Sequence, residues 1–263
     1  FVEIGYRERK PETIKEAATK GLYIEIFKDG RYSGQSTSDL RKDALSEFVK
    51  NAVKMTKLLA EDPFRSLPDS KYYGKLSDVN LNLYDKEIEN LSPEARHQLV
   101  KTLEDACLKK GGDKVISVQA SVYDSYFESI VVTSNGFSGE SKGTAYNAFA
   151  SMTAKDEGDR RPNGYDYAAV THRSKLPDPV GIGERAALRT LDLFGGKKIK
   201  SEKLPIIIEN RGVPRVLSGL GSAMYGRSLQ QKQSFLLDKK GQKIASDKFT
   251  VIDDPLLPEA QGS

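Results

Sequence analysis

Two amphipathic helices dominate the pattern of apolar and polar positions in the first half of the chain. Apolar side chains recur at helical spacing from residue 40 to 59, and again from 95 to 106. The first stretch follows four potential N-caps, Ser36-Thr37-Ser38-Asp39, and ends before Pro63. The second follows Ser92-Pro93, a cap with a proline at the first helical position, and stops at Gly111-Gly112. The pattern therefore predicts a long helix in each of these regions.

Strand patterns surround the two helices. Residues 22–27 and Tyr32 flank a Lys28-Asp29-Gly30-Arg31 turn, and Asp-Gly between β-rich runs predicts a hairpin. Further strands are predicted over 114–123, 127–134, 137–155 and 165–173, with tight turns at Asn135-Gly136 and over 158–164. After the Pro177-Asp178-Pro179 break, residues 183–194 predict a helix closed by Gly195-Gly196.

The segment from Leu204 to Ser263 has a pattern of its own. Pro205 to Ile208 predicts a short buried strand, and the apolar spacing from Val213 to Met224 predicts a helix. A second stripe of this helix holds only small residues: Gly219, Ser222, Ala223 and Gly226. Glycine in a helix costs about 1 kcal/mol relative to alanine, so the stripe favours close packing against another element. A glycine-rich loop is the alternative reading.

The order of elements predicts an α+β fold rather than regular βαβ winding. We expect mixed or antiparallel sheets with packed helices in the N-terminal region, followed by the start of a β-rich C-terminal domain. The expected division is an N-terminal subdomain (1–75, hairpin plus long helix), a middle subdomain (76–198), and an incomplete C-terminal domain (199–263). A polar linker, Ser66 to Lys75, marks the first boundary.

Composition excludes several classes of protein. Of the 263 residues, 30% are charged and 38% hydrophobic, which is typical of a soluble globular protein. No apolar run approaches the ~18 residues of a membrane span, and we expect neither a transmembrane helix nor a signal peptide. A single cysteine excludes an internal disulfide framework, so a cytoplasmic location is expected. The net charge of +4 is spread along the chain, which does not favour nucleic-acid binding.

Catalytic chemistry is hard to find among the reactive residues. His97 shares a helical face with charged residues and is expected on the surface, while His172 has no evident partner. Cys107 is expected to be a small core residue. Two distant histidines and one cysteine do not make a zinc site, which needs three or four converging ligands. Gly181-Ile182-Gly183 lacks the rest of a dinucleotide fingerprint and is interpreted as a helix entry.

Three stretches resemble the TldD/PmbA family, described as modulators of DNA gyrase. They are Asp29-Gly30-Arg31 leading to Ser36–Leu40, the helix start Gly181–Ala186, and the C-terminal segment. In the last, the most specific runs are Lys232–Asp238, Gly241–Ser246 and Phe249–Pro255. The resemblance covers essentially the whole chain, and Phe1 at one end and Glu259–Ser263 at the other lead us to expect a part of a longer protein.

The resemblance implies a cytoplasmic peptidase system of two related subunits. In the TldD-type subunit, the histidines of a His-Glu-x-x-x-His helix and a later cysteine hold zinc, and the glutamate is the general base. The PmbA-type (TldE) subunit keeps the fold, lacks those residues and pairs with the catalytic subunit around an enclosed cleft. Peptides or unfolded proteins are the implied substrates.

This sequence departs from the catalytic pattern where the zinc helix belongs. The window from Arg215 to Ser228 contains no His, Cys, Asp or Glu, the residues that bind zinc. The family's histidine positions fall at Gly219 and Met224, or at Ser218 and Ala223, depending on the register. The residues expected in a cleft or interface are Ser222, Tyr225, Arg227 and Gln233.

We therefore expect a non-catalytic, PmbA-like member, without a cofactor unless a partner subunit holds zinc. It would form a homodimer or a heterodimer with a TldD-like subunit. One alternative is an active metallopeptidase that uses ligands outside this chain. A second is a modulator of DNA gyrase, as the family's description implies.

Overall fold

A computed structural model describes residues 1–73 and 80–260 of the chain. The chain forms two compact units, Phe1–Gly196 together with the residues from Pro255, and Lys197–Asp254. The strands are β1 Val2–Arg7, β2 Lys10–Glu16, β3 Leu22–Lys28, β4 Arg31–Thr37, β5 Val115–Val132, β6 Ser138–Ala154 and β7 Asn163–Val170. The α-helices are α1 Lys42–Thr56, α2 Pro93–Gly111, α3 Pro179–Leu191, α4 Val213–Met224 and α5 Gly226–Gln230. Short 3-10 turns are η1 Ser70–Tyr72, η2 Lys86–Asn90, η3 Gly112–Lys114, η4 Arg173–Lys175 and η5 Asn210–Gly212.

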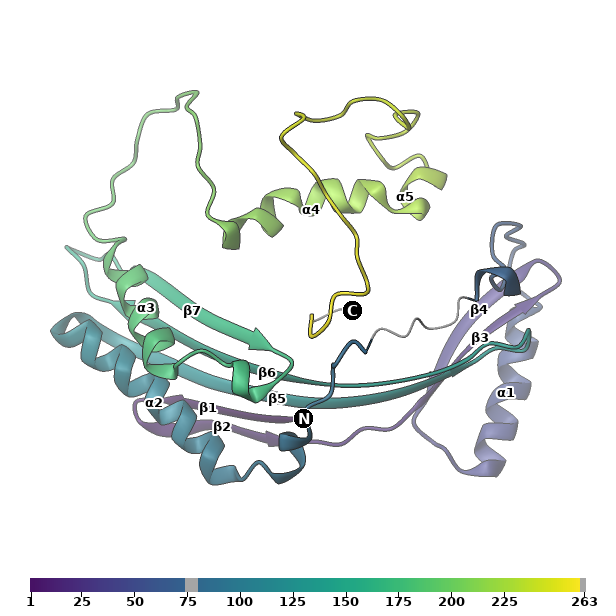
Figure 1. The fold of residues 1–263 in the computed structure, drawn as a ribbon, viewed down its shortest axis with the longest axis horizontal. Helices are drawn as coiled ribbons and strands as arrows, with labels where there is room; N and C mark the ends of the chain where they lie inside the picture. Colours follow the sequence, from purple (N-terminus) through teal and green to yellow (C-terminus); the bar gives the residue numbers. More distant parts are fainter. Residues whose placement is uncertain (74–79, 261–263) are drawn as a thin grey trace. The chain divides into compact units, whose positions relative to one another are not determined.

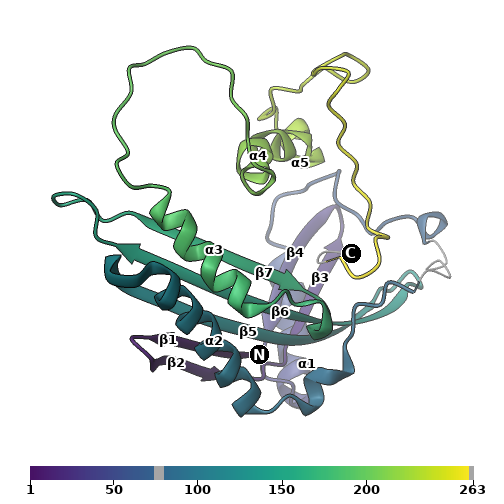
Figure 2. The ribbon, with the colours of Figure 1, turned by 60° about the vertical axis from the view of Figure 1, so that its left-hand side comes forward.

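The first unit is built on a five-stranded antiparallel sheet of order β2-β1-β5-β6-β7. Helices α2 and α3 lie side by side on one face of it (Figures 1 and 2). A separate hairpin, β3–β4, packs against α1. The α+β prediction is confirmed.

Small side chains on β6 allow the two helices to approach the sheet. Every second side chain of β6 faces the helices and is fully buried: Ala148, Ala150, Met152 and Ala154. They pack with Val118 and Val122 of β5, Ile4 and Tyr6 of β1, Leu103 of α2, and Ile182 and Ala186 of α3. Because the side chains on this face are short, the helix backbones approach the strand backbones closely. The core is therefore close-packed although it contains few large side chains.

Helix α2 follows the sequence prediction closely. Ser92 caps it by accepting a hydrogen bond from Ala95 N–H at 3.2 Å, and Pro93 opens it. Gly112, with φ 60°, ends it. In contrast, His97 is not a surface residue as expected: it is half-buried and hydrogen-bonded to the Tyr6 hydroxyl at 2.9 Å. Its helical face packs on β1, which the spacing of charges along α2 does not reveal.

Four other local predictions need correction. Strand β5 runs unbroken from 115 to 132, where two strands separated at 124–126 were expected. Helix α3 begins at Pro179, capped by Asp178, rather than at residue 183. Helix α1 begins at Lys42, and Ser36 and Thr37 belong to β4 instead of capping the helix. Residues 205–208 form no strand; Ile207 is 100% exposed, since the described residues offer this run no strand to pair with.

The second unit contains α4 and α5 and, in its described residues, no strand, so the β-rich character expected after residue 199 is not seen here. The expected boundary between 75 and 76 falls within 74–79, outside the described residues. The division into three regions stays a prediction, although β1 and β2 share a sheet with β5–β7. No helix among residues 1–73 and 80–260 is both long and apolar enough to cross a membrane.

The chain rejoins the first unit near its C-terminal end. Glu259 donates its backbone N–H to Leu81 O at 2.7 Å and accepts a hydrogen bond from the Thr171 hydroxyl at its own carbonyl at 3.0 Å. Its carboxylate accepts a bond from Asn82 Nδ2 at 2.7 Å and pairs with Lys175. Glu259 is thus held by both main-chain and side-chain bonds.

Candidate functional site

The window that should correspond to the zinc helix is α4 with the start of α5. The predicted helix is confirmed over Val213–Met224. Of the four positions that would match the family's histidines, Ser218, Gly219 and Met224 are exposed and Ala223 is buried. Their side chains offer no imidazole, thiolate or carboxylate.

A serine fixes the end of α4. Ser234, itself buried, donates its hydroxyl to the carbonyl of Ala223 at 2.6 Å and accepts the Leu236 N–H at 3.0 Å. One of the carbonyls left open at the end of the helix is thereby satisfied. Ser234 lies in the family-like run 232–238, so this part of the resemblance has a structural role.

The small-residue stripe of α4 does not pack as the sequence predicted. A Cβ atom added at Gly219 or Gly226 would meet no atom of the described residues within 4 Å. Of the stripe, Ala223 alone is buried. The four residues expected in a cleft or interface, Ser222, Tyr225, Arg227 and Gln233, are all exposed on α4, α5 and the following turn. Their proposed roles stay predictions.

An open, mainly apolar pocket of about 300 Å³ lies beside α4. It is lined by Leu220, Met224, Ile244, Ala245, Ser246, Asp247, Phe249 and Val251. Met224, at one of the expected histidine positions, is part of this lining. The pocket therefore presents thioether and hydrocarbon groups, together with one serine and one aspartate, where a metal centre would need several N, S or O donors.

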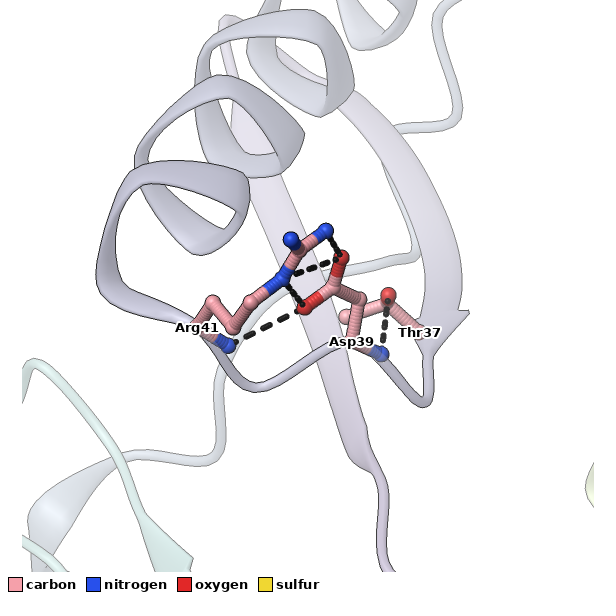
Figure 3. A network of polar contacts seen from close by, with 3 residues as sticks. All are labelled: Thr37, Asp39 and Arg41. Carbon is pink, nitrogen blue, oxygen red and sulfur yellow. Dashed lines mark hydrogen bonds and ion pairs between the residues drawn. The ribbon is translucent and has the colours of Figure 1, made fainter.

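The first family-like stretch forms a polar network between β4 and α1 (Figure 3). The Thr37 hydroxyl accepts the Asp39 N–H at 3.1 Å, and the Asp39 carboxylate accepts the backbone N–H of Arg41 at 3.1 Å. The Arg41 guanidinium donates Nε and Nη2 to the two carboxylate oxygens at 2.9 and 2.5 Å. These bonds, the side-chain bond above all, lower the pKa of Asp39 to about 2. The stretch fixes the entry to α1.

The same region is tied together by its hairpin turn. Asp29 and Gly30 both have positive φ, 51° and 69°, as a tight turn with two left-handed residues requires. Arg31 donates Nε to Leu59 O at 2.9 Å and Nη2 to Glu61 at 2.8 Å. Asp29-Gly30-Arg31 therefore locks the hairpin to the segment that follows α1.

The second family-like stretch, Gly181–Ala186, is a helix contact. Side-chain carbon added at Gly183 would lie 2.4 Å from the carbonyl oxygen of Leu103 and 2.9 Å from Ala106 Cβ. Glycine is needed because α2 and α3 cross at this point with their backbones nearly touching. The interpretation as a helix entry, not a dinucleotide site, is consistent with this packing.

A buried polar cluster that the sequence did not reveal lies at the junction of β5, β6 and α2. Arg96 donates Nε to Asp124 at 2.8 Å, with side chains only 9% and 2% exposed. Asp85 accepts backbone N–H bonds from Glu87 at 3.0 Å and Arg173 at 2.9 Å. The hydroxyl of Tyr146 is buried beside these charges and has no hydrogen-bond partner among the described residues.

Burial and charge shift the pKa values of this cluster in opposite directions. Burial raises the pKa of Asp124, and Arg96 offsets part of that rise. Burial also acts to raise the pKa of Asp85, but the N–H groups of Arg173 and Glu87 outweigh it, and the pKa is lowered. Burial and then the Asp85 charge raise the pKa of Tyr146. Arg96 pairs with the Asp124 carboxylate, and the charge of Arg173 also acts to lower the pKa of Asp124, which is typical of a structural network.

The remaining reactive residues also have structural surroundings. Cys107 is fully buried in the core between α2 and α3, as expected, and burial raises the pKa of its thiol to about 12. His172 is hydrogen-bonded to the Thr171 hydroxyl at 3.2 Å. In the part of the chain that the structure describes, no three His, Cys, Asp or Glu side chains converge as metal ligands.

Three family models account for most of the chain. They describe domain 1, the central domain and the C-terminal domain of the PmbA/TldA metallopeptidases, and they match residues 1–56, 86–194 and 201–263. The chain belongs to the PmbA/TldD metallopeptidase family. The family membership that the sequence motifs indicated is thereby confirmed.

Two similar bacterial proteins carry related names. The metalloprotease PmbA homolog of Haemophilus influenzae is 23% identical over 257 residues, covering 97% of this chain and 56% of the relative. Metalloprotease PmbA of Escherichia coli O157:H7 gives the same values. The chain thus spans little more than half the length of these relatives.

Two solved structures of similar fold show how far the likeness extends. A putative modulator of DNA gyrase from Bacteroides thetaiotaomicron is 36% identical, with a TM-score of 0.93 over 98% of this chain and 58% of its own. TldE from Thermococcus kodakarensis is 21% identical, with a TM-score of 0.73 over 93% of this chain and 54% of its own. The second likeness shows the fold alone.

Proposed function

We propose that this PmbA/TldD chain is part of a non-catalytic, PmbA/TldE-type subunit that shapes the peptide-binding cleft of a two-subunit metallopeptidase. The supporting observation is α4. It is helical over Val213–Met224, where the resemblance leads us to expect a zinc helix, and the window Arg215–Ser228 has no residue type that binds zinc. A bound zinc ion does not fit this donor set, so no catalytic step is assigned to it.

The two histidines of the chain do not replace the missing ligands. His97 is bonded to Tyr6 and His172 to Thr171, and both belong to the first unit rather than to α4. Cys107, buried with a raised thiol pKa, is also unsuited to bind metal or attack a peptide. If the subunit contributes to proteolysis, it does so by holding substrate or by positioning a catalytic relative.

A regulator of DNA gyrase is less well supported. Many arginines of the described residues are engaged with carboxylates instead of forming a basic surface: Arg7, Arg31, Arg41, Arg96, Arg160 and Arg185. DNA binding relies on a concentrated basic face. The main support for that interpretation is the description of the Bacteroides thetaiotaomicron structure as a putative modulator of DNA gyrase.

Metal content and peptidase activity of the full-length protein test the proposal. Purified alone, it should hold no stoichiometric zinc by elemental analysis and should not cleave unstructured peptides. Mixed with a TldD-type relative, it should support chelator-sensitive cleavage. A Glu→Gln change in the relative's His-Glu-x-x-x-His helix is the control, because it should abolish that cleavage while leaving the pairing intact. One tightly bound zinc per chain, or chelator-sensitive cleavage by the protein alone, would refute the proposal and favour an active peptidase with ligands elsewhere.

A further inference from the structure

The chain leaves the first unit at a fixed point after α3. Asp156 accepts the backbone N–H of Gly195 at 3.1 Å, and Arg160 donates Nη2 to Leu193 O at 3.0 Å. Arg160 also pairs with Asp156 at 3.2 Å. The connector that follows, residues 197–209, is exposed and forms no helix or strand. The chain that returns from the second unit therefore has to be fixed by contacts of its own.

The returning chain is held at Glu259. Its backbone N–H donates to Leu81 O at 2.7 Å, and its carbonyl accepts the Thr171 hydroxyl at 3.0 Å. Its carboxylate accepts Asn82 Nδ2 at 2.7 Å and pairs with Lys175. One such bond shifts an equilibrium by a factor of about five. Together these interactions hold Glu259 far more firmly than any one of them does.

The groups that receive this residue form a platform, which consists of residues 81–85, Thr144 and residues 171–175. The Thr144 hydroxyl donates to Thr171 O at 2.7 Å, and the Thr144 N–H donates to Leu83 O at 2.9 Å. Asp85 accepts the backbone N–H of Arg173 at 2.9 Å. Both threonines are buried, at 2% and 5% exposure. Because these bonds do not involve the returning chain, the platform should keep its form when that chain is released.

The backbone conformation of Glu259 shows that its side chain matters. Its φ is 59°, in the left-handed region, and the φ of Asn82 is 48°. Glycine adopts this region without steric cost, whereas glutamate does so rarely. A glutamate persists in such a conformation where its surroundings fix it. Here the bonds of the carboxylate to Asn82 and Lys175 offset the unfavourable backbone conformation.

We propose that Glu259 is a latch. It fastens the chain that returns from the second unit onto the platform, and it keeps that chain in place whether or not the connector 197–209 is intact. The latch opens by release of residues 255–260 from the first unit, with the platform and the five-stranded sheet unchanged. This device goes beyond the proposed function and does not depend on it, since neither a metal nor a substrate takes part.

A closed latch also fixes a proton on His172. The Thr171 hydroxyl has one hydrogen, which it donates to Glu259 O. Its oxygen must therefore accept a hydrogen bond from His172 Nδ1, which lies 3.2 Å away, so this nitrogen carries a proton. Release of Glu259 frees the hydroxyl hydrogen and removes this constraint. A proton on Nδ1 is therefore a signature of the closed latch.

Hydrogen exchange of the full-length protein, followed by mass spectrometry, tests the latch. Residues 199–205 are replaced by the recognition sequence of a site-specific protease, so that the exposed connector can be cut. The peptide that contains Glu259 should keep its protection after the cut. In Thr171→Val/Glu259→Ala, the backbone bond to Leu81 is the one of the four interactions that remains. Protection of the peptide should then fall by roughly 100-fold, about fivefold for each lost interaction.

Glu12→Ala is the matched control. The Glu12 carboxylate accepts Arg7 Nε at 2.7 Å in an exposed ion pair between β1 and β2 that involves no residue of the platform. This change should leave the exchange of the Glu259 peptide as it is in the wild type. Peptides from β5 and β6 report whether each variant folds, and their protection should be the same in every variant.

The proton on His172 provides a second measurement. In nitrogen NMR spectra of histidine-labelled protein at alkaline pH, with the signal assigned through His172→Gln, the wild-type ring should carry its proton on Nδ1. A ring protonated at Nε2 alone would contradict the closed latch, because Nδ1 would then compete with Glu259 O for the Thr171 hydrogen.

Three results of the exchange experiment would overturn the proposal. The first is loss of protection of the Glu259 peptide when the connector of the wild type is cut. The second is wild-type protection of that peptide in Thr171→Val/Glu259→Ala. The third is loss of protection that spreads to β5 and β6, because Glu259 would then be a part of the core fold rather than a latch. Zinc content and peptidase activity, which test the proposed function, do not bear on these outcomes.

Discussion

Replacing Arg96 by methionine should expose how strongly the buried polar cluster stabilises the first unit. The change leaves the Asp124 carboxylate, 2% exposed, without the guanidinium that lies 2.8 Å away. Two unit charges about 4 Å apart attract by about 4 kcal/mol at an effective dielectric constant near 20. Removal of one partner from a buried pair typically costs about 3–5 kcal/mol. Since domains are stable by about 5–15 kcal/mol, Arg96→Met should remove a large fraction of the free energy of unfolding.

Urea unfolding followed by circular dichroism at neutral pH measures this loss, which should correspond to a fall in Tm of about 6–20 °C. The double variant Arg96→Met/Asp124→Leu is the control. Because it has no unpaired buried charge, it should recover most of the free energy of unfolding that Arg96→Met loses. Burial raises the pKa of Asp124. The Asp124 carboxyl therefore stays protonated to a higher pH in the folded protein than in the unfolded chain. The loss of unfolding free energy caused by Arg96→Met should shrink as the pH falls through the folded-state pKa of Asp124. A loss below about 1 kcal/mol, or a double variant no more stable than Arg96→Met, would refute the reasoning.

Three further outcomes follow from single positions. Gly183→Ala should destabilise the first unit by about 1–3 kcal/mol in urea unfolding, because the added Cβ meets the backbone of α2. Gly219→Ala is the control: its Cβ meets no atom within 4 Å, so it should stabilise α4 by about 1 kcal/mol. Equal effects of the two changes would contradict the packing described. The pKa of Asp39 is lowered from 3.8 to about 2. The difference in urea midpoint between wild type and Asp39→Asn should therefore be fully present above about pH 4 and be lost as the pH falls through about 2. A difference that does not shrink over this range would contradict the network. Cys107 should react with a thiol reagent in denaturant and not in the native protein, and rapid native labelling would contradict its burial and raised pKa.

Local signals predicted the elements whose ends are fixed by neighbouring residues. For α2, the Ser92 cap, Pro93 and the glycine stop all act within a few residues of the helix, and the structure follows them. The β3–β4 hairpin likewise depends on Asp29-Gly30. Residues 124–126 look like a strand break because Asp124 is polar, yet it is buried against Arg96, a residue 28 positions earlier in the chain. Only tertiary contact makes such a residue compatible with a strand interior.

The candidate site was predictable in part for the same reason. Helical spacing located α4, and the absence of ligand-type residues follows from the sequence directly. The small-residue stripe did not reveal its surroundings, since Gly219 has open space around it in the described residues. Likewise, the run Ile130–Val132 predicted a strand but not the absence of a neighbour, because an edge is defined by where β1 stops.

Insertion of β1 between β2 and β5 has a consequence for the order in which the protein folds. Val2 pairs with Asp124, about 120 residues later, so at about 5–20 residues per second β1 leaves the ribosome about 6–24 s before its partner strand is made. During this interval the β1–β2 hairpin can form locally, but Ile4 and Tyr6 lack the core residues of β5, β6 and the helices that bury them in the folded protein. The β5–β6–β7 meander involves much shorter separations and closes faster. We therefore expect completion of the sheet by β1 and β2 to be a late step of folding, and Ile4 and Tyr6 to be open to aggregation until β5 is made.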